Sequence, residues 1–283
     1  MGFYHDRALP CLIHLSMRQQ NLVPYRQRVI TAAEGRILEV GVGSGLNLPF
    51  YSDKAAHVIV LDPSPGLMGR ARNEAVRAKR PVELLEGSAE AIPLQDRTVD
   101  TVVTTWTLCT IPAVLGALGE MRRVLRPGGQ LLFVEHGLAP EASVQRWQDR
   151  LTPVWKRIGG GCHLNRSIAG LIEAAGFHID RLETGYMKGP KPMTFMYEGR
   201  ARPQRHGPSA GHRSVLSKPS RNGIGRAGAG RQQWAPSMPH FDGAFHAHAS
   251  SRGGPCRTCS SRRFLDVQAY CDCWRRSAAD GLH

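Results

Sequence analysis

Three closely spaced glycines form the part of this 283-residue chain with the clearest chemical potential. In the segment LEVGVGSGLNLPFY, Gly41, Gly43 and Gly45 follow an apolar run and precede a helix-like start. Because glycine has no Cβ atom, the backbone at such positions can approach a bound ligand closely. Glu39 lies just before the glycines, and its carboxylate can accept hydrogen bonds from a ligand ammonium, directly or through water. The segment therefore predicts a ligand-binding turn.

A second acidic residue lies at the end of the next apolar run. Asp62 follows Gly43 by nineteen residues, with Pro63 directly after it. In a parallel sheet this carboxylate lies beside the glycine turn, where it can accept hydrogen bonds from both hydroxyls of a ribose. The alternative is that Asp62 only caps a helix starting at Ser64 or Pro65.

The spacing of the glycines separates two classes of nucleotide ligand. A dinucleotide-binding turn favours GxGxxG, whereas this chain has GxGxG preceded by Glu39. S-adenosylmethionine (SAM) carries an ammonium that could meet Glu39, and NAD does not. A small polar turn farther along, at Ser88, Ala89 and Glu90, is placed to hold an adenine edge. The interpretation is therefore a SAM site, with NAD-dependent oxidoreduction disfavoured.

Short apolar runs that alternate with helical patterns must position these residues. They predict βαβ units around a mostly parallel sheet, whose carboxyl ends meet at one edge. The expected strands cover residues 36–41, 57–62, 82–87, 99–106 and 129–136, with helices at 65–79, 113–125, 143–158 and 165–176. Arg126 to Gly129 are expected to form a turn on the side away from the ligand.

Two last strand-like runs, 177–186 and 192–199, are separated by a link so short that it suits an antiparallel hairpin. The predicted fold class is α/β: a Rossmann-like doubly wound sheet of seven strands, the last antiparallel, with N-terminal helices and a disordered C-terminal tail. The expected domains are an N-terminal helical cap (1–35), the catalytic domain (36–202) and a low-complexity basic tail (203–283).

Charge is distributed unevenly along the chain. The formal net charge is +14, and residues 204–283 hold twelve Arg and Lys against four Asp and Glu. This tail is rich in Gly, Ser, Pro and Arg, so it cannot bury enough apolar surface to offset its ordering entropy, and we expect disorder. An out-of-frame carboxyl terminus is an alternative explanation of the abrupt change in composition.

Other classes of protein are disfavoured by composition. No run approaches the roughly 18 apolar residues of a membrane-spanning helix, so a cytoplasmic, soluble protein is expected. The seven cysteines do not form the dense framework of a small secreted domain. The tail contains CRTC, CDC and nearby histidines, but their spacing fits no closed zinc site. No bound metal is expected.

The ordered motifs carry a family resemblance. LEVGVGSG, VIVLDPS, GSAEAIPLQDRTVDTVV and MRRVLRPGGQLLFVEH resemble those of class I SAM-dependent methyltransferases of the type-11 group, over roughly Tyr4 to Arg202. GSGLNLPFY, TLCTIP, FVEHG and GGCHLNR resemble the subgroup of thiol methyltransferases and proteins labelled phospholipid N-methyltransferases. The resemblance implies SAM as cofactor. It implies cofactor contacts at Glu39, Gly41, Gly43, Gly45, Asp62, Pro63, Ser88, Ala89 and Thr105. Many relatives have Asp where this chain has Ser88. An Asp carboxylate would bind the adenine amino group more strongly than the Ser88 hydroxyl.

Methyl transfer from a sulfonium depends mainly on positioning. Trp106 could offer an aromatic face to the sulfonium. A base is needed only if the acceptor arrives protonated, and the candidates are His136 and His163. Cys109 and Cys162 are interpreted as small core or loop residues, with a reactive role as the alternative.

The acceptor and the partners are less constrained. We expect a small-molecule or lipid-like acceptor. Residues 143–158 form a basic amphipathic pattern that suits a lid helix over the acceptor or peripheral contact with a membrane. Nucleic acid is not expected as a partner. The alternative function is a non-catalytic protein of this fold that binds nucleic acid through its basic tail.

Overall fold

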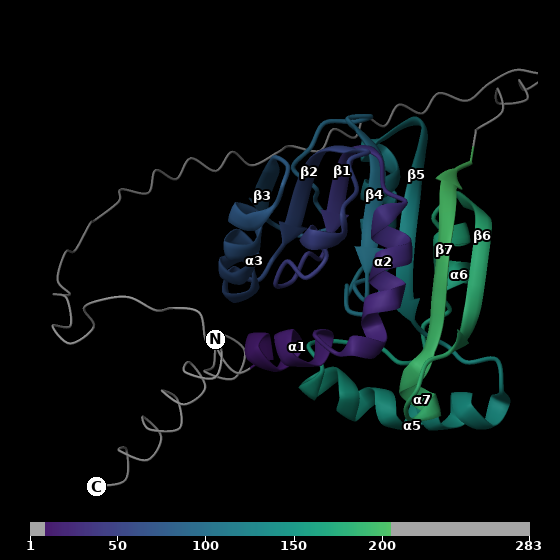
Figure 1. Ribbon diagram of the computed structural model, residues 1–283. Helices are drawn as coiled ribbons and strands as arrows, with labels where there is room; N and C mark the ends of the chain where they lie inside the picture. Colours follow the sequence, from purple (N-terminus) through teal and green to yellow (C-terminus); the bar gives the residue numbers. More distant parts are fainter. Residues whose placement is uncertain (1–8, 205–283) are drawn as a thin grey trace, which may run out of the picture. The chain divides into compact units, whose positions relative to one another are not determined.

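A computed structural model describes residues 9–204, and within them the chain forms one seven-stranded sheet (Figure 1). The strand order is β3-β2-β1-β4-β5-β7-β6. Strands β1 to β5 pair in parallel, whereas β7 is antiparallel to both β5 and β6. The bounds are β1 Gly35–Val40, β2 Ala55–Asp62, β3 Val82–Glu86, β4 Val99–Thr105, β5 Leu125–His136, β6 Phe177–Tyr186 and β7 Phe195–Pro203. The predicted sheet is confirmed.

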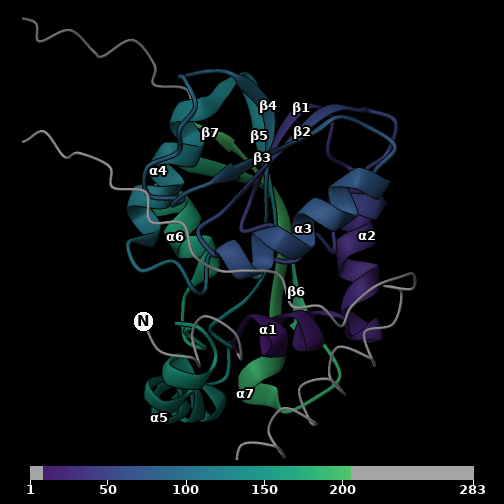
Figure 2. The same ribbon diagram turned by 90° about the vertical axis from the view of Figure 1, so that its left-hand side faces the viewer.

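Helices cover both faces of the sheet, as Figure 2 shows. On one face lie α4 (Val114–Val124) and α6 (Ile168–Ala174), and on the other lie α2 (Val23–Thr31) and α3 (Pro65–Arg77). The central strands are rich in Val, Ile and Leu because both of their faces are buried. Leu38 of β1, for example, lies opposite Ile59 of β2 and Val102 of β4, and all three are fully buried. The doubly wound architecture is confirmed.

Local sequence explains where α3 begins. Ser64 is its N-cap, and the Ser64 hydroxyl accepts a hydrogen bond from the backbone N–H of Leu67 at 3.4 Å. Pro65 occupies the first helical turn, where its missing N–H costs nothing. This start fixes the direction of the chain leaving β2, and with it the position of Asp62 beside the glycine turn.

Further helical segments lie at the carboxyl ends of the parallel strands (Figure 1). They are α1 (Leu9–Met17), the 3₁₀ turns η2 (Gln20–Leu22) and η3 (Leu48–Phe50), α5 (Ala142–Ile158) and α7 (Lys191–Thr194). The expected N-terminal helices are thus present, while the proposed domain boundaries stay a prediction. None of the helices in residues 9–204 is both long and apolar enough to cross a membrane.

Two predicted boundaries are wrong. Residues 126–129 do not separate helix from strand, because α4 ends at Val124 and Leu125 pairs with Val99 at once. The register then shifts before Gln130 pairs with Thr101, so the RPGG segment is an irregularity within β5. The last apolar run also begins in α7, which delays β7 to Phe195. The predictions about the basic tail and its cysteines concern residues that lie almost entirely outside the described range, 9–204.

Candidate functional site

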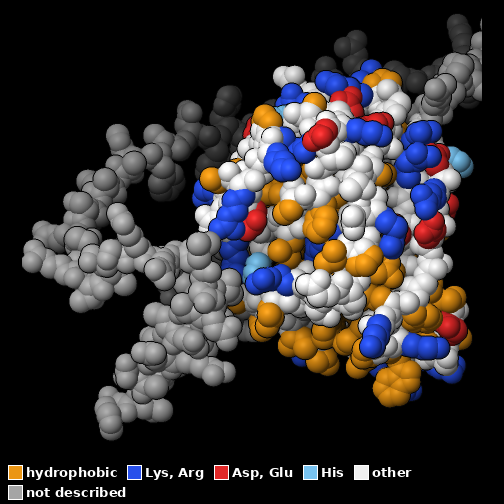
Figure 3. Space-filling model, in the orientation of Figure 1, with side chains coloured by type: hydrophobic (Ala, Val, Ile, Leu, Met, Phe, Trp, Pro, Cys, Tyr) orange, Lys and Arg blue, Asp and Glu red, His pale blue; other side chains and the backbone are white. Residues whose placement is uncertain are grey.

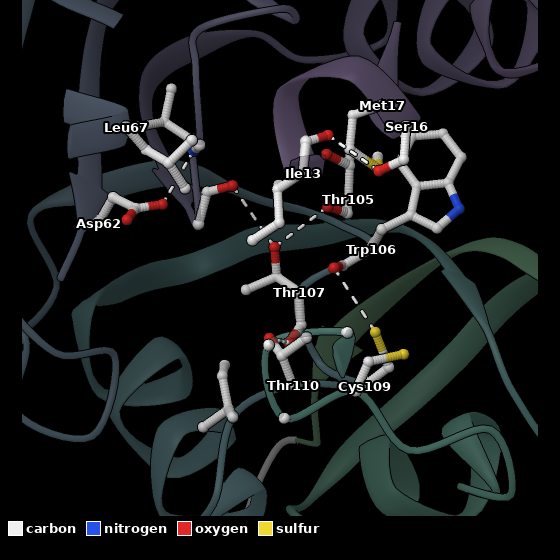
Figure 4. A pocket seen from close by; sticks show the side chains of 18 of the residues that line it. Ile13, Ser16, Met17, Asp62, Leu67, Thr105, Trp106, Thr107, Cys109 and Thr110 are labelled. Carbon is white, nitrogen blue, oxygen red and sulfur yellow. Dashed lines mark hydrogen bonds between the residues drawn. The ribbon is translucent and has the colours of Figure 1, made fainter. Parts of the chain in front are cut away.

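A cavity of about 1090 Å³ opens at the carboxyl ends of the parallel strands. Figure 4 shows Asp62 and Leu67 on one side, Ile13, Ser16 and Met17 of α1 across from them, and Cys109 and Thr110 on the loop after β4. The volume lies slightly above the usual range for small-molecule sites, which is roughly 300–1,000 Å³. It can hold a nucleotide-sized cofactor together with a second molecule.

The three glycines of the turn have different roles. Gly41 (φ +75°) lies so close to the Thr107 side chain that a Cβ would collide with it, whereas a Cβ on Gly43 (φ +57°) would meet no atom within 4 Å. Both line the cavity. Gly45 does not: a Cβ there would lie 3.0 Å from the Cα of Ala71 in α3. The structure therefore places Gly45 in helix packing, away from the cavity.

Asp62 joins the glycine turn to the start of α3 at the edge of the cavity. Its Oδ2 accepts a hydrogen bond from the Gly43 N–H and its Oδ1 accepts one from the Ser64 N–H, both at 2.9 Å. Burial raises the pKa of this carboxyl, and the two backbone hydrogen bonds oppose that rise. The carboxylate lines the cavity with spare acceptor capacity, as binding of ribose hydroxyls requires.

Glu39 does not line the cavity. Its side chain is fully buried, and its two oxygens accept hydrogen bonds from Asn47 Nδ2 at 2.8 Å and from the Tyr51 hydroxyl at 2.7 Å. Burial raises the pKa of Glu39 to about 7, against the effect of those two hydrogen bonds and of the charge on Arg26. The Glu39 carboxylate is thus bonded to Asn47 and Tyr51 and does not reach the cavity wall.

Asn47 extends this buried network to the cavity wall. Its Oδ1 accepts a hydrogen bond from Arg26 at 2.6 Å, and its Nδ2 also donates to Thr105 Oγ1 at 2.9 Å. Both Arg26 and Thr105 line the cavity. The guanidinium carbon of Arg26 lies 4.9 Å from the centre of the Trp106 ring, so one face of that ring is already covered by a cation. At most the opposite face of the Trp106 ring therefore remains for contact with a sulfonium.

The remaining predicted cofactor residues lie around the same end of the cavity. Pro63, Ser88, Ala89 and Glu90 all line it. The Ser88 hydroxyl accepts a hydrogen bond from the Glu90 N–H at 3.2 Å, which turns the chain directly after β3. The structure thus brings the predicted cofactor residues together, apart from Glu39 and Gly45.

The two candidate bases lie in different places. His136, at the end of β5, lines the cavity, and its Nε2 lies 3.1 Å from Cys162 Sγ. His163 is not among the lining residues. Its backbone N–H and its Nδ1 both bond to the carbonyl oxygen of Cys109, at 2.9 and 3.2 Å. His163 therefore holds the loop after β4 in place.

That loop is fixed from a second side by Glu135. Its Oε1 accepts hydrogen bonds from the backbone N–H groups of Thr107 and Leu108, at 2.9 and 3.0 Å. Arg166 donates to the carbonyl of Leu108. Because of these contacts Cys109 faces the cavity, where Cys162 also lies. The interpretation of these cysteines as ordinary core or loop residues missed this placement.

Comparison with known proteins fits this geometry. The methyltransferase domain profile matches residues 38–133. Thiol S-methyltransferase TMT1B of Homo sapiens is 35% identical over 178 residues, which is 60% of this chain and 70% of the relative. The chain belongs to the methyltransferase domain family. Phosphatidylethanolamine N-methyltransferase of Cereibacter sphaeroides, a further relative, is 39% identical over 109 residues, 38% of this chain and 53% of that protein. The predicted methyltransferase identity and the predicted cofactor, SAM, are confirmed.

The match to the thiol S-methyltransferases is partial, since the chain spans 64% of the length of the Rattus norvegicus protein and 70% of the human one. Solved structures share the methyltransferase fold. A putative methyltransferase from Bacillus halodurans has a TM-score of 0.52 at 16% identity, over 65% of this chain and 96% of its own. A SAM-dependent methyltransferase from Thermotoga maritima has a TM-score of 0.51 at 21% identity, over 70% and 99%.

Several site residues had been missed in the sequence. Arg26 lies in the expected N-terminal helical cap, and Asn47 and Tyr51 follow the glycine turn. The signal for the last two was present, because a polar Asn and a Tyr follow the glycines in an otherwise apolar stretch. Arg26 had no such signal, since an arginine on a short helix is normally solvated.

Proposed function

We propose that this methyltransferase transfers a methyl group from SAM to the sulfur of a small, largely apolar thiol. The observation that carries the proposal is a single cavity with two different ends. Asp62, Ser88 and the glycine turn line it, and so do apolar side chains such as Ile13 and Trp155, which lie next to the loop after α5. The relatives named thiol S-methyltransferases support sulfur as the acceptor atom.

The donor end would hold SAM, which supplies an electrophilic methyl group on a sulfonium. Asp62 is placed to accept hydrogen bonds from the ribose hydroxyls, and Ser88 and Ala89 to border the adenine. Gly43 leaves the space that a side chain would fill. Glu39 acts indirectly in this proposal: it fixes Asn47, which in turn fixes Arg26 and Thr105 at the cavity wall.

The acceptor end favours an apolar molecule. Leu9, Leu12 and Ile13 of α1 line it from one side, and Met187 and Met193 line it from another. Burying apolar surface there supplies roughly 25 cal/mol per Å². Methionine side chains adapt to acceptors of different shape. The chain's part in catalysis is to hold the acceptor sulfur in line with the methyl group and to keep water away.

Supporting evidence for contact with a membrane comes from the outer surface of α1 and α5. Leu12, Leu15, Trp147 and Val154 are large apolar side chains with more than half of their surface exposed. Figure 3 shows hydrophobic side chains, with Lys and Arg among them, along the lower edge, where Figure 1 places α1 and α5. We propose that this surface lies on anionic lipid, because α5 also carries Arg146, Arg150, Lys156 and Arg157 against one acid, Asp149. The cavity mouth would then face apolar acceptors dissolved in the lipid.

Sedimentation with vesicles tests this contact. The full chain should bind vesicles containing phosphatidylserine, and the pair Trp147→Ser and Val154→Ser should weaken binding about tenfold. Leu115→Ser is the control, since Leu115 is half exposed on α4. Equal binding of all three proteins would contradict the proposal. The cytoplasmic location predicted from the sequence stays a prediction.

A competition assay tests the acceptor. The full chain is incubated with SAM and a matched series of apolar molecules that differ only in thiol, hydroxyl or amine, alongside a quinol and phosphatidylethanolamine vesicles. Mass spectrometry should find the thioether as the main product. Methylation of the amine or the quinol instead would overturn the thiol assignment. Absence of any SAM turnover, together with salt-sensitive nucleic-acid binding that depends on residues 204–283, would favour the non-catalytic alternative.

A further inference from the structure

Two cysteines and a histidine meet in the wall of the cavity. Cys109 lies on the loop after β4, His136 at the end of β5, and Cys162 on the glycine-rich loop after α5. One ligand atom from each, two sulfurs and an imidazole nitrogen, lie within 4.8 Å of one another. Their exposed fractions are only 2%, 9% and 8%, yet all three line the cavity. Three segments that are far apart in the sequence thus bring these side chains next to one another.

The surrounding structure holds these side chains in place. Cys162 Sγ lies 3.1 Å from His136 Nε2 and accepts a hydrogen bond from the Trp155 indole at 3.3 Å. Cys109 is fixed through its backbone by His163, and its loop by Glu135. Supporting contacts of this kind are typical around metal ligands.

Unsatisfied polar atoms belong to the cluster and to the residue that precedes His136. Among the described residues, His136 Nδ1 and Glu135 Oε2 are buried without a hydrogen-bond partner. Buried polar groups of this kind are rare, because each costs about 1–3 kcal/mol. A bound cation next to the imidazole and the carboxylate would make their burial less costly. The cluster is therefore incomplete as a purely structural feature.

The ligand set matches a particular metal. Two thiolates and one imidazole suit zinc, with bonds of about 2.3 Å to sulfur and about 2.0–2.1 Å to nitrogen. In a tetrahedron of those bond lengths, the ligand atoms lie roughly 3.5–3.8 Å apart. The three atoms lie within 4.8 Å of one another here, so zinc binding would require the side chains to rotate. Three protein ligands leave the fourth position free, as in catalytic rather than structural zinc sites, and a ligand in the cavity could reach it because all three residues line the cavity.

We propose that Cys109, His136 and Cys162 bind one zinc ion, and that its fourth position takes the sulfur of the acceptor thiol. The second part rests on the proposed function. A thiol that coordinates the metal releases its proton to solvent and becomes a thiolate. A lone pair of the thiolate forms the new sulfur–carbon bond, while the old bond to the sulfonium breaks and its electron pair stays on S-adenosylhomocysteine. The neutral thioether then dissociates, and no base or oxidant is needed.

Metal content tests the binding part. The full chain, with its four tail cysteines (Cys256, Cys259, Cys271 and Cys273) replaced by serine, is equilibrated with zinc and desalted before elemental analysis. About one zinc per chain is expected. Cys109→Ser, Cys162→Ser and His136→Gln each remove a ligand, so each should lower zinc affinity by more than the roughly 10–100-fold that loss of an outer-shell partner costs. Cys11→Ser is the matched control, since Cys11 is an exposed free cysteine of α1.

Each variant is checked for S-adenosylhomocysteine binding, so that a misfolded protein is not counted. Less than a tenth of a zinc per chain in a protein that still binds S-adenosylhomocysteine would overturn the proposal. A Cys109–Cys162 disulfide found by mass spectrometry after reducing purification in the presence of zinc would overturn it as well.

Cobalt substitution tests the open position. Co²⁺ in a site with two thiolates and one imidazole gives visible absorption bands, and an apolar thiol should shift them whereas the matched alcohol should not. Absorption bands that do not shift when the thiol is added would overturn the coordination step. Failure of the two proposals can be told apart: thiol methylation by fully metal-free protein would remove only the zinc proposal, whereas zinc binding with methylation of amines alone would remove the thiol function.

Discussion

The two ends of the cavity are built in different ways. The donor end comes from the carboxyl ends of β1, β2 and β3 and from the turns that follow them, and Asp62 ties two of these turns together through backbone N–H groups. The acceptor end is proposed to consist of α1, the loop after β4, the loop after α5 and the methionines near α7, which all line the cavity. Helix α1 also contacts the glycine turn, since His14 Nδ1 lies 2.7 Å from Ser44 Oγ. The donor end depends on local backbone geometry, whereas the acceptor end depends on long-range packing of side chains. Substitutions should therefore separate them.

The largest effect is expected at the glycine turn. Gly43→Arg places a long side chain into the donor end at a positive φ of 57°, so affinity for S-adenosylhomocysteine should fall at least about 100-fold. Calorimetric titration with S-adenosylhomocysteine measures this affinity. Gly69→Arg is the matched control, because Gly69 lies in α3 and a Cβ there meets nothing within 4 Å. Unchanged affinity in Gly43→Arg would mean that the cofactor lies elsewhere.

The next effect is the pH dependence of folding stability that arises from Glu39. Burial raises the pKa of Glu39 from 4.5 to about 7 in the folded chain. Between those two values the folded state binds more protons than the unfolded state, so this carboxyl's contribution to the free energy of unfolding falls as the pH rises. The loss is roughly 3 kcal/mol across the window.

Glu39→Gln should remove that part of the pH dependence. Urea denaturation at pH 5 and at pH 7.5 measures it, with Glu86→Gln, an exposed carboxyl of β3, as the control. A stability difference between the two pH values that is the same in Glu39→Gln as in the unmodified chain would show that the buried network does not hold the proton.

Asp62→Ala should weaken binding of S-adenosylhomocysteine about 10–100-fold, since hydrogen bonds to a charged group are worth roughly 1.5–3 kcal/mol. The KM of the thiol acceptor should change less than about twofold, because Asp62 belongs to the donor end only. Asp53→Ala serves as the control, as the Asp53 side chain is fully exposed. An equal loss at both ends would show that the ends are not independent.

The smallest effect is expected at α1. Leu12 lines the acceptor end with about half of its side chain exposed, so Leu12→Ser should raise the KM for an apolar thiol about fivefold and leave the KM for SAM unchanged. Leu115→Ser, at an equally exposed leucine outside the cavity, should change neither. Steady-state kinetics with a water-soluble apolar thiol distinguishes these outcomes. A rise in the KM for SAM alone would reassign α1 to the donor end.

The contrast between local backbone geometry and long-range packing also explains what could be predicted from the sequence. The strands, the glycine turn and Asp62 were predicted because apolar runs, glycine spacing and chain order are local signals. Gly45 does not line the cavity because α3 packs against it, and the sequence does not show that contact. Arg26, Cys109 and Cys162 reach the cavity only through contacts between distant segments, and a single sequence carries no record of such contacts. His136 lines the cavity and His163 does not, and the role of either as a base stays a prediction.

The most direct test is a crystal structure of the full chain with S-adenosylhomocysteine and an apolar methyl thioether. The account predicts the adenosine between Asp62 and Ser88. It predicts the thioether at the other end, against Ile13 and Trp155, with its sulfur facing Cys109. A thioether bound outside this cavity, or adenosine at the α1 end, would contradict the division of the cavity into a donor end and an acceptor end.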